Sequence, residues 1–533
     1  MIPWRPIPRT RTTRLLAALA AGLMILSATA PVASAHRPGF RTAEPAMLEG
    51  VGGTTVKALM TVGDTLSNGY RFEAIPDGIS VKPRGHGRLD VYINHETSTV
   101  PFPYVAAGPT AANSLNDFDN AQLSKLVLSR NSARVLSGKL VIKSSENFQR
   151  FCSNFLATRA QGFSRDILFT NEETPDFVYR TGRAWPTIPG DPAAQQAGVV
   201  VAYDVKTGAR KPILGMGRLN HENSVAIPGF RKVVVLTGDD TFVTNPAQSQ
   251  VYAYLADNAR DVWKDKGSLY GFKSDVAGVD DYYDFTPGST MSVSGHFVKI
   301  PKAVAVGDQT GLETASDAAG VFQFVRIEDI AYDRTHPNVV YLADSGRASA
   351  LTDNGFASTN GRIWKMVLDK HNPKKVRSLS ILIDGDTTGL GVASVMHQAD
   401  NLETTRRSLL ITEDPSSANQ FNVDDPNGTT ARIWRYDFKT RALTVAAKVV
   451  QTADEGLTDK DPSTTAGRWG TWESSGIVDV SKYFGRGTFL VDVQAHSLFV
   501  EVGAGPDLVE PDGADWLNKR EGGQLLLIRI PGA

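Results

Sequence analysis

The sequence has a single cysteine, Cys152, among its 533 residues. An intramolecular disulfide therefore cannot form, which excludes a disulfide framework. Neither charge is in excess, with 56 basic and 57 acidic residues, so the composition gives no sign of nucleic acid as a partner. With 41% hydrophobic and 21% charged residues, the chain is neither disordered nor a coiled coil. The fold must therefore be stabilised by side-chain packing or by bound metal.

Long apolar runs are missing after the N-terminus. In the first 35 residues, four arginines precede an apolar run from Leu15 to Leu26, and Ala33-Ser34-Ala35 supplies the small residues that a signal peptidase cuts after. A membrane anchor is the alternative, but the run is too short to span about 30 Å of hydrocarbon. We expect residues 1–35 to be a cleaved signal peptide. Residues 36–533 then form a single secreted domain without a membrane span.

Long amphipathic helical patterns are also scarce, and short alternating or β-branched runs fill the rest of the chain. A unit recurs among these runs: an acidic opening, a short strand, a turn, and a very apolar strand that ends in acids. One unit runs from HENSV at His221 to VVVLTGDD, and another from RIEDI at Arg326 to VVYLADSG. Two earlier strands, VYINHET and ILFTNEET, end in the same way. We count six units.

Most units close with a second hairpin, such as RIWKMVLDKHNPKKVRSLSIL or RIWRYDFKTRALTVAAKVV. Four strands per unit are typical of a propeller blade, so the sequence predicts an all-β, six-bladed β-propeller with inserted loops. The terminal run QLLLIRI is expected to pair with early residues and close the ring. A two-layer sandwich also uses short strands, but it does not explain why acids recur at one point of every unit.

A propeller brings equivalent strand ends together around its central channel, so the recurring acids should converge there. They are Glu96, Glu172, Glu173, Glu222, Asp239, Asp240, Glu328, Asp344, Asp400, Glu413, Glu473 and Asp492. So many carboxylates in one place repel one another unless they are protonated or bind cations. Calcium suits oxygen ligands, and His95, His221 and His496 offer imidazole for a transition metal.

Simpler interpretations stay open for individual residues. An acid at a strand end can bind the backbone amides of a turn, although the pairs Glu172-Glu173 and Asp239-Asp240 exceed what a turn needs. Cys152 is either a buried small hydrophobic residue or a thiolate ligand that selects iron or zinc. Arg326 is placed either to hold a phosphate or to form a salt bridge with a neighbouring acid.

Several familiar catalytic motifs are missing from the sequence. It has no P-loop, no dinucleotide-binding glycine fingerprint, no HExxH, and no G-x-S-x-G elbow with a usable histidine. The functions that remain are metal-assisted catalysis and ligand binding.

The motifs present resemble those of the PhoX family of secreted bacterial alkaline phosphatases, which are six-bladed propellers. The resemblance covers Cys152 to Glu173, NHEN with GDD from Asn220 to Asp240, RIEDIAYDRTHPNVVYLAD from Arg326 to Asp344, and ADNL with ITED from Asp400 to Asp414. It implies a phosphomonoesterase with a cluster of iron (Fe³⁺) and calcium ions at the channel mouth.

The same resemblance assigns roles to residues. It makes Cys152, Glu222 and Glu328 iron ligands, and Arg326 the group that binds the substrate phosphate. Glu222 and Glu328 thereby become catalytic together with Arg326. Glu172, Glu173, Asp239, Asp240, Asp400 and Glu413 fall on the calcium side, and the convergence of acids adds Glu473 to the metal ligands.

We therefore expect a monomer that releases inorganic phosphate from a small phosphoester. Two alternatives stay open. One is a calcium-dependent propeller hydrolase of the lactonase or phytase type, and the other is a secreted binding propeller in which calcium is structural.

Overall fold

The computed structural model describes residues 39–73, 75–96, 121–143, 146, 148–174, 177–178, 195–243, 246–346, 360–387, 396–414, 430–451, 472–501 and 519–533. The expected signal peptide lies outside these ranges. Among the described helices, none is long and apolar enough to cross a membrane. Strands dominate the described part of the unit Gly39–Ala533, where the longest helix, α4, has 11 residues.

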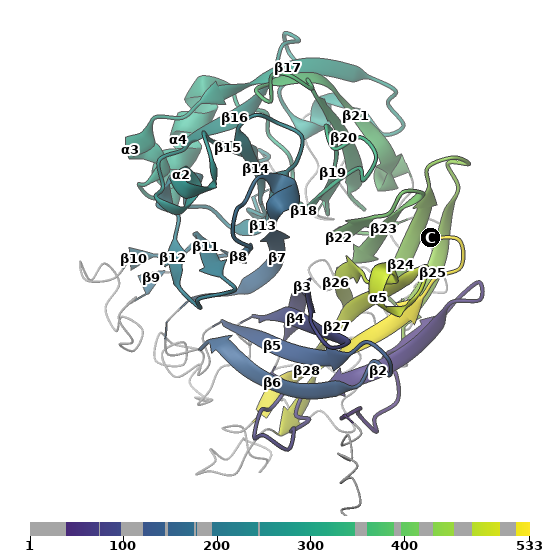
Figure 1. The fold of residues 1–533 in the computed structure, drawn as a ribbon. Coiled ribbons are helices and arrows are strands. Elements are labelled where there is room, and N and C mark those ends of the chain that lie inside the picture. Colours follow the sequence, from purple (N-terminus) through teal and green to yellow (C-terminus); the bar gives the residue numbers. More distant parts are fainter. Residues whose placement is uncertain are drawn as a thin grey trace, which may run out of the picture. The chain divides into compact units, whose positions relative to one another are not determined.

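Six innermost strands form a closed ring around the centre of this unit (Figure 1). Each contacts the next along the chain, and the last contacts the first. They are β3 (Pro76–Arg84), β7 (Phe151–Ala157), β13 (His221–Ile227), β18 (Ile327–Tyr332), β22 (Ala399–Thr404) and β26 (Glu473–Asp479). The propeller fold is confirmed, and the closed ring supports the blade number of six, which stays a prediction.

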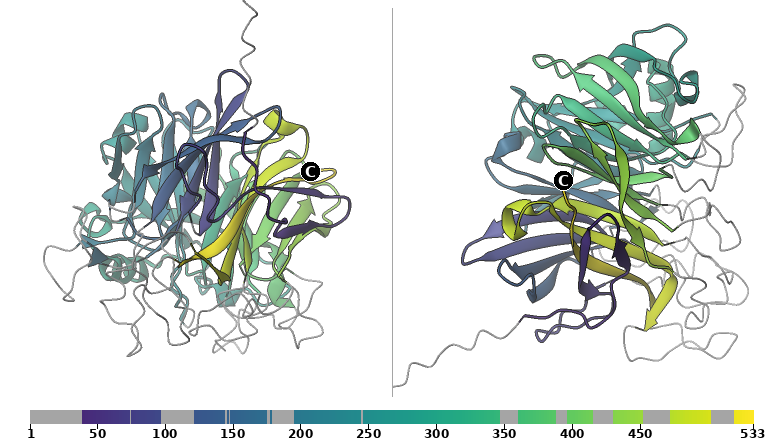
Figure 2. Two further views of the ribbon diagram at one scale, coloured as in Figure 1. Left: turned by 90° about the horizontal axis from the view of Figure 1, so that it is seen from below. Right: turned by 90° about the vertical axis from the view of Figure 1, so that its right-hand side faces the viewer.

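Three further antiparallel strands continue outward from each inner strand, in the sheets that Figure 2 shows from two further sides. In ring order they are β4 (Arg88–His95), β5 (Gln122–Ser129) and β6 (Val135–Ile142); β8 (Ile167–Glu172), β11 (Val200–Asp204) and β12 (Arg210–Pro212); β14 (Val233–Asp239), β15 (Val251–Ala256) and β16 (Ser268–Ser274); β19 (Val339–Asp344), β20 (Arg362–Leu368) and β21 (Lys375–Asp384); β23 (Ser408–Glu413), β24 (Arg432–Asp437) and β25 (Leu443–Val449); β27 (Thr488–Glu501), β28 (Lys519–Arg529) and β2 (Thr55–Thr61). Strands such as VVVLTGD are buried along their whole length because sheets cover both of their faces.

The two ends of the described chain close the ring. Strand β2, near the start, pairs with β28, near the end, from Thr55 opposite Arg529 to Thr61 opposite Gln524. This confirms the predicted pairing of QLLLIRI with early residues. The short strand β1 (Leu48–Gly50) adds to the neighbouring sheet by pairing with β25.

The remaining elements are insertions and short connections. Strand β17 (Ser292–Lys299) pairs with both β16 and β21 and so joins two neighbouring sheets into one of nine strands. The others are β9 (Phe177–Val178), β10 (Gln195–Gln196), α2 (Ala259–Trp263), α3 (Lys302–Ala305), α4 (Gln309–Ala319), α5 (Ser481–Phe484), and the 3₁₀ turns η2 (Arg159–Gln161), η3 (Leu214–Met216), η4 (Tyr282–Asp284) and η5 (Gly385–Thr387). Asp308 caps the N-terminus of α4 through the amide of Gly311.

Apolar side chains fill the space between neighbouring sheets. Around the fully buried Trp364, the rings of Phe285, Phe324 and Tyr282 pack edge-on with centroids 5.0, 5.6 and 5.6 Å away. The Trp364 indole nitrogen donates to Asp344 Oδ2 at 3.2 Å. Such packing fixes each sheet relative to the next and thereby the level at which the inner strands meet.

Candidate metal centre

Each of the six innermost strands carries a β-bulge at the same point. In β13 the pairing advances by three residues after His221 while β14 advances by two, so Glu222 and Asn223 face one residue of β14. The same step occurs in β3, β7, β18, β22 and β26. The ring therefore presents two bulged residues per strand at one level.

The first bulged residues form the core of the site. They are Asp77, Cys152, Glu222, Glu328, Asp400 and Ser475. Five of these six are metal-ligating types, and together with Glu96 and Glu173 they make three groups whose ligand atoms lie within 4.8 Å of one another. The groups are Asp77, Glu96 and Cys152; Cys152, Glu173 and Glu222; and Glu222, Glu328 and Asp400. We call these seven residues the carboxylate–thiol cluster.

The thiol of Cys152 lies among carboxyl groups. Its Sγ donates to Asp77 Oδ2 at 2.6 Å and lies 3.8 Å from Glu96 Oε1. Burial raises the pKa of the Cys152 thiol well above its usual value, and the nearby acids, Asp77 first, raise it further. Without a cation the thiol stays protonated. A bound metal ion would reverse this preference by stabilising the thiolate.

The carboxyl groups on the other side of the cluster also have raised pKa values. Burial, followed by repulsion from Glu173 and Glu328, raises the pKa of Glu222 well above its usual value. Burial, followed by repulsion from Glu473, raises that of Asp400. Glu222 Oε2 and Asp400 Oδ2 have no hydrogen-bond partner among the described residues. Buried carboxylate oxygens without a partner are suited to bind cations. The single thiol is a better ligand for iron or zinc than for calcium.

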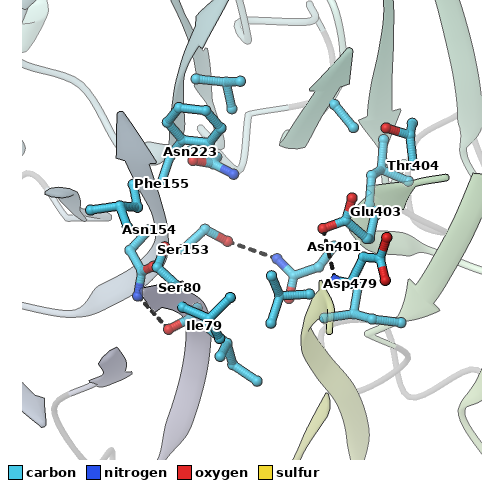
Figure 3. Close-up of a pocket in the computed structure, with 18 of the residues that line it drawn as sticks. Ile79, Ser80, Ser153, Asn154, Phe155, Asn223, Asn401, Glu403, Thr404 and Asp479 are labelled. Carbon is cyan, nitrogen blue, oxygen red and sulfur yellow. Dashed lines mark hydrogen bonds between the residues drawn. The ribbon is translucent and has the colours of Figure 1, made fainter. Parts of the chain in front are cut away.

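The second bulged residues are small or polar and line a different space. They are Gly78, Ser153, Asn223, Asp329, Asn401 and Gly476, and all six border a cavity of about 500 Å³ (Figure 3). Asn401 Nδ2 donates to Ser153 Oγ at 2.7 Å, and Ser153 Oγ donates to Glu222 Oε1 at 2.9 Å. This polar layer separates the cavity from the carboxylate–thiol cluster. The bulge thus sends most of the ligand-type side chains to one side of the layer and leaves small or amide side chains and Asp329 on the other.

Three acids that the sequence placed among the metal ligands have other partners. Glu172 accepts the backbone amides of Gln149 and Val199 at 2.8 and 3.2 Å. Glu413 accepts the amides of His397 and Arg432, both at 2.8 Å.

The third is Asp239, which accepts the hydroxyl of Thr241 at 2.8 Å. Glu172, Asp239 and Glu413 all end the second strand of a sheet, and none joins the three groups found among the described residues. Their hydrogen bonds stabilise turns and the nearby backbone, which agrees with the simpler interpretation that an acid at a strand end binds the amides of a turn. Their predicted ligand role gains no support from this geometry.

Arg326 forms a buried ion pair beside the cluster. Its guanidinium contacts Asp240 through two hydrogen bonds of 2.8 and 2.7 Å, and Nη2 lies 2.7 Å from Glu328 Oε1. Only 3% of the Arg326 side chain is exposed. The salt-bridge interpretation of Arg326 therefore describes this structure, and its predicted contact with phosphate stays a prediction. Asp240 serves as its partner and not as a member of the cluster.

Arg150 is a second cation at the cluster, and sequence reasoning missed it. It directly precedes the innermost strand β7, as Arg326 directly precedes β18. Its Nε lies 3.7 Å from Glu96 Oε2, and 34% of its side chain is exposed. Arg150 and Glu173 both line a cavity of about 530 Å³, which reaches the cluster through Glu173.

The other predicted residues take separate positions. Glu473 is buried at the start of β26, where burial and then a hydrogen-bonded Asp414 raise its carboxyl pKa, and it joins none of the three groups. Histidine rings are engaged elsewhere: His95 Nε2 lies 2.7 Å from Ser124 Oγ, and His221 Nδ1 lies 2.7 Å from Thr237 Oγ1. The side chain of His496 is outside the described residues.

A propeller with a buried carboxylate–thiol cluster at the centre of its ring is therefore the class that fold and site define. A family model described as "Alkaline phosphatase PhoX" matches residues 189–474. Among solved structures, Pseudomonas fluorescens PhoX in complex with vanadate, a transition state analogue, matches with a TM-score of 0.63 and 15% identity, over 92% of this chain and 97% of that chain. A GH93 α-L-arabinofuranosidase of Fusarium graminearum matches with a TM-score of 0.38 and 9% identity, over 88% and 97%.

No match was found among curated proteins. The family model covers more than half of the chain, so this protein belongs to the PhoX alkaline phosphatase family. It is accordingly a phosphomonoesterase built on a propeller. The resemblance seen in the motifs is confirmed.

Proposed function

We propose that this protein is a secreted phosphomonoesterase whose carboxylate–thiol cluster holds several cations, with calcium at the all-oxygen positions and iron at Cys152. One observation carries the proposal. A bulge repeated in six strands brings five buried ligand side chains from residues 77 to 400 to one level of the ring. Proteins do not otherwise bury so many like charges together.

The reaction is the hydrolysis of a small phosphomonoester. The oxygen of water bonds to phosphorus, the P–O bond to the alcohol breaks, and the alcohol leaves with one proton as inorganic phosphate forms. When bound, the cations would neutralise the phosphate oxygens and polarise the attacking water. Asp77, Glu96, Cys152, Glu173, Glu222, Glu328 and Asp400 would hold them.

Two arginines divide the remaining work. Arg150 lines the open cavity and is one-third exposed, which places it to hold the phosphate group as it enters. Arg326 is clamped between Asp240 and Glu328, and it orients the Glu328 carboxylate toward the cluster. The phosphate contact that the sequence assigned to Arg326 thus falls to Arg150 in this proposal.

Elemental analysis joined to turnover tests this function. Protein from the native host should contain calcium and iron, and EDTA should remove both the metals and the hydrolysis of p-nitrophenyl phosphate. Glu222→Gln and Asp400→Asn should lower metal content and turnover together, while the exposed Glu49→Gln serves as a matched control. Full metal content and full turnover in both cluster variants would contradict the assignment.

A further inference from the structure

A cavity of about 530 Å³ lies against the carboxylate–thiol cluster at the seam between the β7 and β13 sheets. Glu173 of the cluster and Arg150 line the cavity together with Asn220, which directly precedes β13. Helix α4 forms a further wall with Thr310 and Glu313. The cavity therefore begins where a substrate phosphate would bind and extends away from the metal site.

The seam differs from its two neighbours in the residue that precedes the inner strand. At the adjoining seams this residue is an arginine that faces an acid of the preceding sheet: Arg150 with Glu96, and Arg326 with Asp240. Here the equivalent residue is Asn220, directly before β13. Among the described residues no third arginine closes this seam, and a cavity is present there.

Asn220 has an unused acceptor. Its Nδ2 donates to the backbone oxygen of Asp240 at 3.2 Å, while its Oδ1 has no hydrogen-bond partner among the described residues. The residue is only 5% exposed. A buried acceptor without a partner costs about 1–3 kcal/mol, so this oxygen favours a donor supplied from the cavity.

The α4 wall also offers mainly acceptors. Both carboxylate oxygens of Glu313 accept from Gln250 Nε2, at 2.9 and 2.8 Å, which fixes the carboxylate at the wall. Asp317 adds a second carboxylate one turn further along, and among the lining residues that the structure describes Arg150 is the one cation. The helix is held in place because Gln309 Nε2 donates to Thr241 Oγ1 at 3.0 Å.

These observations point to the alcohol side of the substrate. We propose that this cavity holds the leaving group and selects a neutral polyhydroxy alcohol, as in the monophosphates of sugars and glycerol. Hydroxyl groups would donate to Asn220 Oδ1 and to the Glu313 carboxylate. A leaving group with a second phosphate or carboxylate is disfavoured by Glu313 and Asp317. This inference rests on the proposed hydrolysis at the adjacent cluster.

The leaving-group inference is tested by measuring relative turnover of several substrates with the metal-loaded protein. The kcat/KM values for glycerol 1-phosphate, glucose 6-phosphate and glucose 1,6-bisphosphate are each divided by that for p-nitrophenyl phosphate, which has no hydroxyl donors on its leaving group. Asn220→Ala and Glu313→Ala should each lower the ratio for the two polyol monophosphates about tenfold, the effect of one lost hydrogen bond. Glu313→Gln should instead raise the ratio for the bisphosphate.

The controls separate the possible outcomes. Asp261→Asn removes an acid from another short helix, α2, which lines a different cavity, and it should leave every ratio unchanged. Unchanged ratios in the Asn220 and Glu313 variants, or a wild-type preference for the bisphosphate, would overturn the leaving-group inference while the proposed hydrolysis stands. A wild-type protein that is metal-loaded and inactive on every phosphomonoester would overturn both.

Discussion

Asp77 and Cys152 occupy the same position in the bulges of neighbouring strands, and the Cys152 thiol donates to Asp77 Oδ2 at 2.6 Å. Two chain segments 75 residues apart are thereby joined at the centre of the ring. The contact marks where a soft ligand enters a site otherwise made of oxygen atoms, and it decides which metals the site can hold.

Removing the sulfur should change metal identity more than metal binding. We expect Cys152→Ser to lose iron and to keep most of its calcium, with turnover of p-nitrophenyl phosphate reduced at least tenfold. The reason is that a hydroxyl is a poor replacement for a thiolate at an iron site. Metal analysis of the purified variant checks this. A Cys152→Ala variant with normal iron and turnover would mean that the cysteine is only a buried small side chain.

Acids that bind metal and acids that hold backbone should respond differently to the same substitution. Glu413→Gln should lower the free energy of unfolding by about 2–4 kcal/mol, because Glu413 accepts two backbone amides, Arg432 and the Trp434 indole nitrogen. Its metal content should stay normal. Glu222→Gln should show the reverse pattern. Urea denaturation and metal analysis of both variants distinguish them, and equal metal loss in the two would contradict the division.

The metal-free protein should become less stable as pH rises. Burial raises the pKa of Asp77 to about 7, helped by Glu96, and burial raises that of Asp344 to about 7. An unfolded aspartate has a pKa of about 3.9, so between these values the unfolded chain has released protons that the folded chain still holds. The contribution of these two groups to stability is therefore full below about pH 4 and is lost as the pH rises through about 7.

Calcium should remove the part of this loss that comes from the cluster, because a bound cation replaces the protons. Urea denaturation of EDTA-treated protein at pH 5, 6, 7 and 8, with and without calcium, measures both effects. A metal-free protein that gains stability over this range would contradict the sign.

The two arginines should give different kinetic signatures. Arg150→Gln is expected to raise KM for p-nitrophenyl phosphate about tenfold or more with normal metal content, because it removes a charge-assisted contact to phosphate. Arg326→Gln should reduce metal content and stability, since Asp240 and Glu328 lose their buried partner. If Arg326→Gln alone raises KM and leaves metals intact, the phosphate contact belongs to Arg326.

A glycine of the last bulge should be intolerant of substitution. A Cβ at Gly476 would lie 2.6 Å from the backbone oxygen of Asp77, closer than real Cβ contacts allow. We expect Gly476→Ala to push Asp77 out of the cluster, to cost about 1–3 kcal/mol, and to lower metal affinity. The exposed Gly85→Ala, with no atom within 4 Å of its Cβ and no left-handed backbone, tests the effect of a glycine change away from the site.

Much of the site was predictable because the recurring acids mark the inner strands. Cys152, Glu173, Glu222, Glu328 and Asp400 were all expected to converge, and the structure places them together. Asp77 was missed. In the sequence, Pro76-Asp77-Gly78 has the composition of a turn, and only its register with β4 shows that it is a bulge.

Two predicted ligands, Glu172 and Glu413, lie outside the three groups, and one physical cause explains why the sequence does not separate them from the cluster residues. Both are acids at the end of an apolar strand, which is also the sequence pattern that predicted the cluster residues. Whether such a side chain faces the centre or the backbone of its own sheet depends on a shift of one residue in pairing, which the sequence does not reveal. Arg150 carried no recognisable signal at all, because it is surrounded by no acidic motif.

The pairing of β2 with β28 has a consequence for biosynthesis. A ribosome releases β2 hundreds of residues before its partner, so the ring must stay open, with an unmatched sheet edge, until β28 has emerged. Assembly of the finished circle is therefore a late, long-range event, and truncation by as little as the final strand should trap an incomplete, aggregation-prone form.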